Sequence, residues 1–211
     1  MSVKSVLKTC GKGLGRLLLI LCTVIGVTMI GCRLEPPQGR TQSVHLSPAE
    51  TKLTTLGKAA AQEQAKHPEL SGLYLLSDPR EAFAARVKLA KQAEKTLDVQ
   101  YYIWHGDATG SLLLETLYEA AERGVRVRML IDDHGTSGLD EAFSAMDAHP
   151  NIEVRLFNPF VFRPFKLFGF VTDFSRANRR MHNKSFTADN AATILGGRNV
   201  GDEYFGATDG V

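Results

Sequence analysis

Residues 70–211 switch repeatedly between two hydrophobic periods, and this switching predicts strands that alternate with helices. Short alternating or continuous apolar runs predict strands at 73–76, 97–104, 125–131 and 152–157. Apolar residues at helical spacing lie between these runs, after 78–81, after Thr109 and over 139–148. Strands that alternate with helices predict βαβ units, and therefore an α/β domain whose sheet is covered by helices.

Single residues indicate the ends and faces of two of these helices. Asp78 before Pro79 is a helix start, Thr109 is the expected N-cap of the next helix, and Gly124 is expected to end it. The expected inward face of the first helix is Phe83, Val87, Leu89, Ala90 and Ala93. Its outward cations are Arg86, Lys88 and Lys91. The expected buried face of the second helix is Leu112, Leu113, Leu117 and Ala120.

The first 32 residues have the pattern of a targeting segment. Four cations form its basic start: Lys4, Lys8, Lys12 and Arg16. An uncharged, mostly apolar run over 17–30 follows, and Gly31 before Cys32 resembles the bacterial lipobox. A lipobox implies cleavage before Cys32 and a diacylglyceryl group on its sulfur. Met29 stands where lipoboxes usually carry Leu, so an uncleaved anchor helix is the alternative. Both interpretations place the body at a cell membrane of the bacterial envelope.

A linker and a helix are expected between the leader and the body. The linker is rich in Pro, Gln and Gly and has no apolar period. Ser47, followed by Pro48 and by Glu50 three residues later, has the pattern of a capping box, and the helix is expected to end at Lys66. The predicted organisation is a signal or anchor at 1–32, a linker and helix at 33–69, and one domain at 70–211.

The composition limits the classes of function. A chain of 211 residues with 44% hydrophobic content is long enough for one globular domain. Its net charge of +2 is far below that of a general nucleic-acid binder, so no specific nucleic acid is expected as a partner. All three cysteines, Cys10, Cys22 and Cys32, lie in the leader, so the body has neither a disulfide nor a thiol metal site.

One stretch of the body carries a recognisable chemistry. His182 and Lys184 are two residues apart, so in a strand both side chains would lie on the same face. An imidazole can attack phosphorus, and a neighbouring ammonium can stabilise the charge that develops on its oxygens. Further along, Gly196 and Gly197 would let a ligand approach the backbone closely, and Asn199 adds a neutral donor.

These residues form the pattern H-x-K-x4-D, from His182 to Asp189, followed by G-G-x-N at 196–199. The pattern resembles the phospholipase D superfamily. The wider sequence is similar to the bacterial C-type cardiolipin synthases at 97–104, 154–160, 179–186 and 196–205. The resemblance implies a phospholipase D-like mixed sheet flanked by helices, which is one half of the usual two-motif pseudo-dimer.

The resemblance also implies a two-step phosphodiester reaction that uses no metal and no other cofactor. His182, Lys184 and Asp189 would be the catalytic set, with His182 becoming a phosphohistidine and Asp189 ordering the motif. Lys184, Gly197 and Asn199 would bind phosphate oxygens. In the cardiolipin synthase branch the acceptor is the glycerol hydroxyl of a second phospholipid. The implied function is therefore phosphatidyl transfer in cardiolipin or phospholipid synthesis, with a phospholipid substrate at a membrane surface.

The motif occurs only once, because none of the other five histidines has Lys two places later. A second half, from a missing C-terminal portion or a second chain, would supply the histidine that protonates the leaving alcohol. Asp202 and Glu203 are weak substitutes for the carboxylate that usually orients the nucleophilic histidine. The chain is therefore expected to be the front half of a two-motif enzyme and inactive alone. A homodimeric, metal-independent nuclease and an inactive truncated remnant are the alternatives.

Residues 157–174 contain seven of the eleven phenylalanines, with Arg163 and Lys166 among them. This mixture is typical of a lipid interface, but it also suits a loop packed under the site. The first interpretation predicts a lid that faces acyl chains, formed by Phe162, Phe165 and Phe168.

Charged residues lie close to the motif and at the end of one predicted strand. Three arginines precede His182: Arg176, Arg179 and Arg180. They would either raise the local potential for an anionic headgroup or form a solvated helix end. The Asp-Asp-His run at 132–134 is expected to be a turn with an exposed Asx cap rather than a metal site.

Overall fold

The computed structural model describes residues 15–16, 18–23, 42 and 44–208. The chain divides into two compact units, Gln42–Phe160 with Ser175–Val211, and Met1–Thr41 with Val161–Phe174. The larger unit contains the sheet and the stretch around His182. Each unit is described by itself below.

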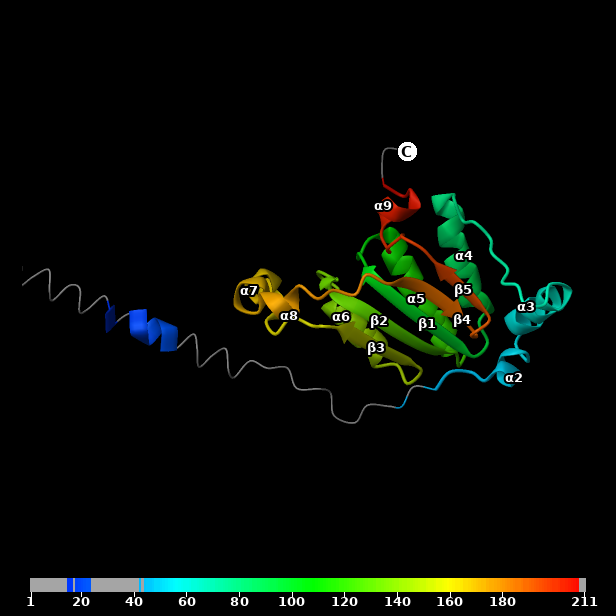
Figure 1. The fold of residues 1–211 in the computed structure, drawn as a ribbon, viewed down its shortest axis with the longest axis horizontal. Helices are drawn as coiled ribbons and strands as arrows, with labels where there is room; N and C mark the ends of the chain where they lie inside the picture. Colours follow the sequence, from blue (N-terminus) through cyan, green and yellow to red (C-terminus); the bar gives the residue numbers. More distant parts are fainter. Residues whose placement is uncertain (1–14, 17, 24–41, 43, 209–211) are drawn as a thin grey trace, which may run out of the picture. The chain divides into compact units, whose positions relative to one another are not determined.

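The larger unit is built on a mixed five-stranded sheet with the order β3-β2-β1-β4-β5 (Figure 1). Its strands are β1 (Thr96–Ile103), β2 (Arg126–Gly135), β3 (Ile152–Phe157), β4 (Lys184–Ala188) and β5 (Ala192–Leu195). Strands β1, β2 and β3 are parallel, whereas β4 pairs antiparallel with both β1 and β5. The prediction of an α/β fold is confirmed, as are the strands predicted at 97–104, 125–131 and 152–157.

The prediction of a strand at 73–76 is wrong. This segment forms no strand, and Leu73 is 97% exposed. An apolar run becomes a strand only where a neighbouring strand completes its backbone hydrogen bonds. In the described sheet both edge positions are held by β3 and β5, and neither of them pairs with this run.

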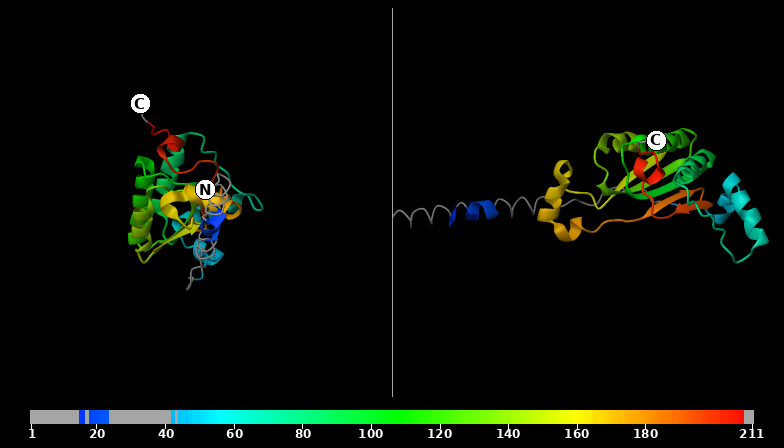
Figure 2. Two further views of the ribbon diagram at one scale, coloured as in Figure 1. Left: turned by 90° about the vertical axis from the view of Figure 1, so that its left-hand side faces the viewer. Right: turned by 90° about the horizontal axis from the view of Figure 1, so that it is seen from above.

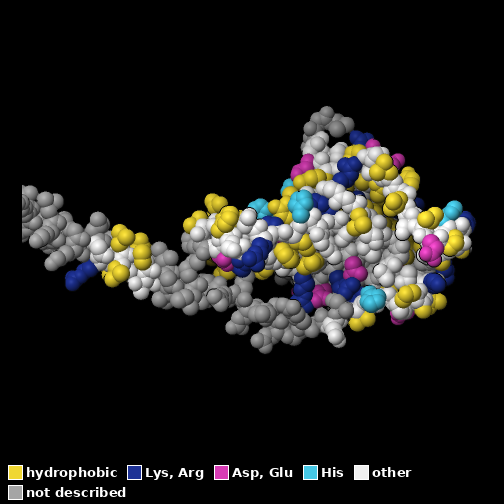
Figure 3. Space-filling view, viewed as in Figure 1, with side chains coloured by type: hydrophobic (Ala, Val, Ile, Leu, Met, Phe, Trp, Pro, Cys, Tyr) yellow, Lys and Arg dark blue, Asp and Glu magenta, His cyan; other side chains and the backbone are white. Residues whose placement is uncertain are grey.

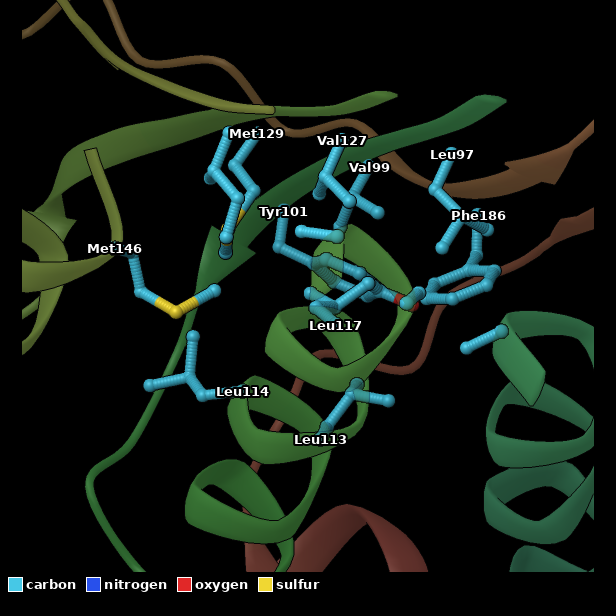
Figure 4. Close-up of a cluster of buried hydrophobic side chains, with 14 of the residues drawn as sticks. Leu97, Val99, Tyr101, Leu113, Leu114, Leu117, Val127, Met129, Met146 and Phe186 are labelled. Atoms are coloured by element: carbon cyan, nitrogen blue, oxygen red, sulfur yellow. The ribbon is translucent and has the colours of Figure 1, made fainter. Parts of the chain in front are cut away.

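Three helices, α4 (Pro79–Gln92), α5 (Ala108–Glu122) and α6 (Asp140–Asp147), lie on one face of the sheet (Figure 2). Their apolar faces enclose the core together with β1, β2 and β4 (Figure 4). Core side chains include Leu97, Val99, Tyr101, Leu113, Leu114, Leu117, Val127, Met129, Met146 and Phe186. Removing this apolar surface from water, at about 25 cal/mol per Å², is the main term that holds the sheet and helices together.

Two details of α5 differ from the prediction. Asp107, not Thr109, is the N-cap, and its carboxylate accepts a hydrogen bond from Gly110 N. Thr109 is the second residue of the helix. Leu112 is exposed and Leu114 is buried in its place, because the helical period aligns residue 114, not residue 112, with the face of Leu113 and Leu117.

The opposite end of α5 is as predicted. Arg123 is the C-cap, and Gly124 follows it with a φ of +89°, a conformation that glycine adopts without the steric cost of a Cβ.

The expectation that Arg86 is in solvent is wrong, because Arg86 is buried on the inner side of α4. Its Nε donates to the Tyr101 hydroxyl at 2.7 Å, and its guanidinium lies 5.3 Å from the centre of the Phe205 ring. A buried cation is tolerated where its donors are satisfied, and here a phenol and a helix carbonyl, Ala82 O, accept from it. The expected inward positions of Phe83 and Ala90 are confirmed: Ala90 is buried in the core, and Phe83 is partly buried and packs against it.

The helix predicted to begin after Ser47 is interrupted. Ser47 and Glu50 form the predicted capping box, but α2 ends after one turn (Pro48–Thr51). A new helix, α3 (Thr55–Lys66), begins after Thr54, whose hydroxyl accepts from Gly57 N. This second N-cap ends the first helix, and the predicted end at Lys66 is confirmed.

The remaining elements are short. Helix α9 (Asp202–Phe205) follows β5, whereas η1 (Arg163–Phe165) and α7 (Lys166–Thr172) belong to the smaller unit, and α8 (Phe174–Ala177) begins at its end. Cys32 and most of the predicted leader lie outside the described residues. Among the helices that the structure describes, none has the length and apolar character needed to cross a membrane.

Candidate active site

One edge of the sheet brings together the ends of several strands. Because β1 and β2 are parallel and β4 is antiparallel to them, the carboxyl ends of β1 and β2 meet the amino end of β4. Lys184, the first residue of β4, pairs with Tyr101 near the end of β1. Strand β5 ends at the same edge, since its last residue, Leu195, pairs with Ser185. The 196–199 segment therefore follows β5 at the edge where β4 begins.

Lys184 is a buried cation without a carboxylate partner among the described residues. Its side chain alternates with the core residues Phe186 and Ala188 along β4, and it is 7% exposed. Its ammonium donates to His182 O at 2.9 Å and lies 5.2 Å from the centre of the Tyr102 ring. Burial lowers the pKa of this ammonium below its ordinary value. An anion that binds here would compensate a charge that the fold leaves unpaired.

His182 is exposed and precedes β4, so strand alternation does not position it beside Lys184, as the sequence had predicted. Tyr102 brings the two side chains together instead. Its ring lies 4.8 Å from the His182 ring, centre to centre, and the same ring faces the Lys184 ammonium. The pairing of β1 with β2 is irregular between Tyr101 and Ile103, at the position of Tyr102. The exposed imidazole and the buried ammonium are thus arranged around one aromatic ring.

Asp132 fixes the backbone directly before His182. Its carboxylate is fully buried and accepts from Met181 N at 2.7 Å, from an Arg180 guanidinium nitrogen at 3.0 Å and from His134 N at 2.8 Å. Residues 132–134 continue β2, so the expected turn is wrong, and so is the expected exposure of Asp132, although its carboxylate does accept from the backbone two residues later, as in an Asx cap. Tertiary contact with residues 180 and 181 buries Asp132, which the local sequence does not reveal.

The arginines before His182 are held by this arrangement. Arg180 pairs with Asp132, donates to Asn158 O at 2.8 Å and lies over the Phe160 ring. Arg176 donates to Asn158 Oδ1 at 2.7 Å and to Pro159 O at 2.9 Å. Neither is a simply solvated helix end; both tie the chain before His182 to the segment after β3.

Asp189 orders the start of β1. Its carboxylate is fully buried and accepts hydrogen bonds from the backbone amides of Glu94 at 3.0 Å, Lys95 at 2.8 Å and Thr96 at 2.9 Å. The residue itself has a φ of +51°, in the turn between β4 and β5. These contacts lie at the far end of β4 from Lys184.

Asn199 lies beside the end of β1. It is buried, and its Oδ1 accepts from Ile103 N at 3.2 Å. The backbone of the next residue, Val200, donates to Ile103 O at 3.1 Å and accepts from His105 N at 3.0 Å. These hydrogen bonds begin just after Tyr101, where the pairing of β1 with β4 stops. Gly196 and Gly197 face open space, because a Cβ built on either would have no heavy atom within 4 Å. This side of the site is accessible to a ligand.

The two carboxylates after Asn199 have other partners. Asp202 accepts from Thr109 N at 2.8 Å, and this hydrogen bond lowers the pKa of its carboxyl below the ordinary value. Glu203 lies 3.4 Å from His105. Asp202 therefore contacts the start of α5, and Glu203 contacts a residue just after β1. Neither carboxylate is shown beside His182, so neither is assigned to orient it. Among the described residues, no group of three or more His, Cys, Asp or Glu side chains is arranged to hold a metal ion.

The family is shown by comparison with known proteins. The family described as "Cardiolipin synthase, PLD-like domain" matches residues 87–209, which include the entire site. The chain belongs to this family. The resemblance to the phospholipase D (PLD) superfamily and its cardiolipin synthase branch is thereby confirmed.

Individual cardiolipin synthases are similar to part of the chain. Cardiolipin synthase C of Escherichia coli (strain K12) is 60% identical over 142 residues, which cover 67% of this chain and 30% of that protein. The major cardiolipin synthase ClsA of Bacillus subtilis (strain 168) is 33% identical over 132 residues, 63% of this chain and 26% of that protein. The chain thus spans less than a third of the length of either relative. Among solved structures, NucT from Helicobacter pylori aligns with a TM-score of 0.46 and 17% identity, covering 64% of this chain and 77% of that one.

Two residues of the PLD-like site were not predicted from the sequence. Tyr102 was assigned only to a strand, and Asp132 only to a turn, although each contacts the residues around His182. The only signal for Asp132 was its place at the end of a predicted strand, where α/β proteins often gather functional residues. Alternation along β1 places Tyr101 on the core face with Leu97 and Val99 and Tyr102 on the other face, but it does not indicate that Tyr102 meets His182.

Replacing Lys184 by methionine is expected to stabilise the fold while weakening anion binding. The variant keeps the length of the side chain but removes a buried charge, so the free energy of unfolding should rise by about 1 kcal/mol at neutral pH. Inorganic phosphate should bind roughly tenfold more weakly or worse, because the compensating cation is gone. Urea unfolding and isothermal titration with phosphate measure the two effects.

The pH dependence provides an internal control for this variant. Because the pKa of Lys184 is lowered in the folded state, its cost to stability is fully present at neutral pH. The cost falls as the pH rises through the lowered folded pKa and disappears above the unfolded value of 10.5, where the lysine is neutral in both states. The stability difference between Lys184→Met and the unaltered chain should therefore shrink at alkaline pH. A difference that is constant with pH would contradict an electrostatic origin.

Proposed function

We propose that this chain carries half of a phospholipase D-type active site that transfers phosphatidyl groups between phospholipids through a phosphohistidine. The observation that carries the proposal is the pair formed by the exposed His182 imidazole and the buried, carboxylate-free Lys184 ammonium. A nucleophile beside an unpaired cation suits a phosphate diester, in which the attacked atom is surrounded by anionic oxygens.

In the first step, a ring nitrogen of His182 forms a bond to phosphorus, and the bond from phosphorus to the leaving alcohol breaks. The alcohol leaves with a proton from a general acid. In the second step, the hydroxyl of an acceptor attacks phosphorus, the N–P bond breaks, and the same acid, now a base, removes the hydroxyl proton. With a phospholipid glycerol as acceptor the product is a new phosphatidyl ester, and with water it is phosphatidic acid.

The other site residues support this step without forming bonds. The Lys184 ammonium and the Asn199 amide would hold the non-bridging oxygens, and the open space over Gly197 would admit the phosphate. Asp189 acts at a distance, by fixing the strand pairing that places Lys184. Asp132 restrains the backbone at Met181, so it limits how far the His182 ring can move.

The general acid is proposed to be a second histidine from a second H-x-K half. This chain contains the motif once, and it spans 30% of the length of Escherichia coli cardiolipin synthase C. The second half could come from another segment or from another chain. A membrane location, by lipid on Cys32 or by an anchor helix, would bring the site to its phospholipid substrate.

A chimaera tests the proposal. The 142-residue stretch of Escherichia coli cardiolipin synthase C that matches this chain is replaced by the corresponding residues of this chain. The chimaera is incubated with phospholipid that carries ³²P in its phosphate. Products are separated by thin-layer chromatography, and trapped protein is denatured in alkali, which preserves an N–P bond. Label on the ring of residue 182, together with new phosphatidyl ester, is the expected result.

Three outcomes would overturn parts of the proposal. A folded, active chimaera that never retains label at His182 would refute the covalent intermediate. Label that appears only with phosphatidic acid as product would make the site a hydrolase. Metal-independent cleavage of plasmid DNA without any turnover of lipid would refute the lipid assignment.

A further inference from the structure

The segment 161–174, called the insert below, exposes large apolar side chains. Leu167 is 76% and Val171 80% exposed, and they lie four residues apart in α7, so they share one face of the helix. Phe165 is 67% exposed, and its ring stacks on that of Phe162 at 5.7 Å. Phe174, also exposed, follows α7. Figure 3 shows apolar side chains on the surface of α7 and α8.

This much exposed apolar surface in a 14-residue segment is unusual for a protein that remains in water. Scattered single apolar residues are ordinary on a surface, but here they occur on consecutive turns. The segment must therefore be covered when the protein functions, and its composition indicates by what.

Charge complementarity favours an anionic lipid surface. The insert contains two cations, Arg163 and Lys166, against a single acid, Asp173, and the exposed Arg179 follows it; Arg176 and Arg180 are engaged by Asn158 and Asp132 instead. Rings and aliphatic side chains in the acyl boundary, with cations at the level of phosphates, are the arrangement of an interfacial membrane segment. A protein partner would equally need an acidic surface, but a lipid also agrees with the substrate class, and to that extent the inference rests on the proposed function.

The chain on both sides of the insert is fastened within the larger unit. Asn158 Nδ2 donates to Arg176 O and to Arg179 O, each at 2.7 Å, and Arg176 returns a hydrogen bond to Asn158 Oδ1. Phe160 N donates to the buried Asp133 carboxylate at 2.7 Å. These contacts hold together the two segments that flank the insert, residues 158–160 and 176–180, which are called the neck below. The neck continues directly into Met181 and His182.

We infer that the insert is a membrane-binding wedge, which sinks Leu167, Val171 and neighbouring phenylalanines into the acyl boundary of an anionic phospholipid surface. The neck keeps the two ends of the wedge together, so the chain leading to His182 begins where the wedge ends. Of the phenylalanines predicted as a lid, Phe162 and Phe165 belong to this wedge; nothing in the inference depends on the side chain of Phe168.

Tryptophan fluorescence on the full chain tests the wedge. The chain has one tryptophan, Trp104, which is fully buried and gives a constant background that also reports folding. Leu167→Trp is compared with Leu73→Trp, a matched control at an exposed leucine of the larger unit. Both are mixed with vesicles of phosphatidylglycerol and phosphatidylcholine, with or without bromine on the acyl chains. The leader is present in both, so its own binding affects them equally.

The added tryptophan at 167 should shift its emission to the blue and be quenched roughly twofold by brominated chains, because an interfacial segment sinks about 5–10 Å. The tryptophan at 73 should do neither. A separate double variant, Leu167→Ser with Val171→Ser, should bind vesicles roughly tenfold more weakly than Leu73→Ser with Leu75→Ser. Only the first pair removes apolar surface that the membrane would bury. Both pairs replace exposed residues, so Trp104 emission should stay unchanged.

The inference is overturned if position 167 is insensitive to bromine, or if position 73 is quenched equally. Equal quenching in pure phosphatidylcholine would refute the preference for anionic lipid. Because the readout requires no turnover, His182→Ala should leave it unchanged. If the chimaera transfers phosphatidyl groups while the tryptophan at 167 stays in water, the wedge is refuted and the proposed function stands. If the tryptophan at 167 enters the acyl region but the chimaera is inactive, the proposed function is refuted and the wedge stands.

Discussion

Replacing His182 by alanine in the chimaera is expected to lower phosphatidyl transfer by about 10⁴-fold or more and to abolish labelling of the protein. The imidazole is exposed at the edge of the sheet, whereas the neighbouring Lys184 is buried and its ammonium donates to His182 O, so it is not positioned to attack phosphorus. Tyr102, the other group beside it, is needed only to hold the ring. The other imidazole on the Tyr102 ring is that of His134, whose ring centre lies 6.1 Å away, so His134→Ala is measured beside His182→Ala.

The control is His149→Ala, which removes another imidazole from the same domain. His149 pairs with Glu122 at 2.9 Å, at the end of α5 and far along the chain from the motif. It should leave transfer unchanged within about twofold, because its contacts are with Glu122, Tyr118 and Asn151 and not with the motif; its side chain is only 10% exposed, so urea unfolding of this variant is measured as well. Because His182 is exposed, its loss should not alter urea unfolding. If His182→Ala retained a tenth of the activity, the nucleophile would have to be another residue.

Asp189→Ala is expected to cost about 3–5 kcal/mol of unfolding free energy, a large part of the stability of a domain of this size. The substitution removes a fully buried carboxylate and leaves three backbone amides at the start of β1 without their acceptor, that of Thr96 in a buried position. Urea unfolding followed by Trp104 emission measures the loss. Asp189→Asn should lose less, because the amide keeps one oxygen that can accept from Lys95 and Thr96.

A matched control for this variant is Asp78→Ala. Asp78 also accepts from two backbone amides, those of Arg80 and Glu81 at 2.8 and 2.9 Å, but it does so at an exposed helix start. Water can replace a lost cap there, so this variant should cost about 1 kcal/mol. If the two alanine variants lost equal stability, the buried position of Asp189 would not be decisive, and its ordering function would be wrong.

Much of the fold follows from local patterns. The strand at 97–104 and the helix after Asp78 were predicted correctly, because a period of two or of 3.6 residues depends only on which side of the element is buried. The same reasoning failed at 73–76, where an apolar run has no strand beside it. Sequence periodicity describes one element, whereas a strand exists only together with its neighbour.

Charged residues were predicted least well. Arg86 and Asp132 were expected in solvent, and both are buried because distant residues satisfy them: Tyr101 for the first, Arg180 and Met181 for the second. The cost of burying a charge depends on partners that the chain brings from elsewhere. Local sequence contains no information about those partners, so the default of solvent exposure was wrong at both positions.

By itself, the sequence determined the family and the residue types of the candidate site: a single H-x-K-x4-D motif, two glycines and an asparagine, in an α/β domain. Only the tertiary structure decided how they meet. The antiparallel placement of β4 next to β1 brings Lys184 to the strand end at which Tyr102 faces His182, and it leaves room for Asn199 beside Ile103. The physical reason is that side-chain identity is local, whereas burial, and with it the unpaired charge of Lys184, results from packing between segments far apart in the chain.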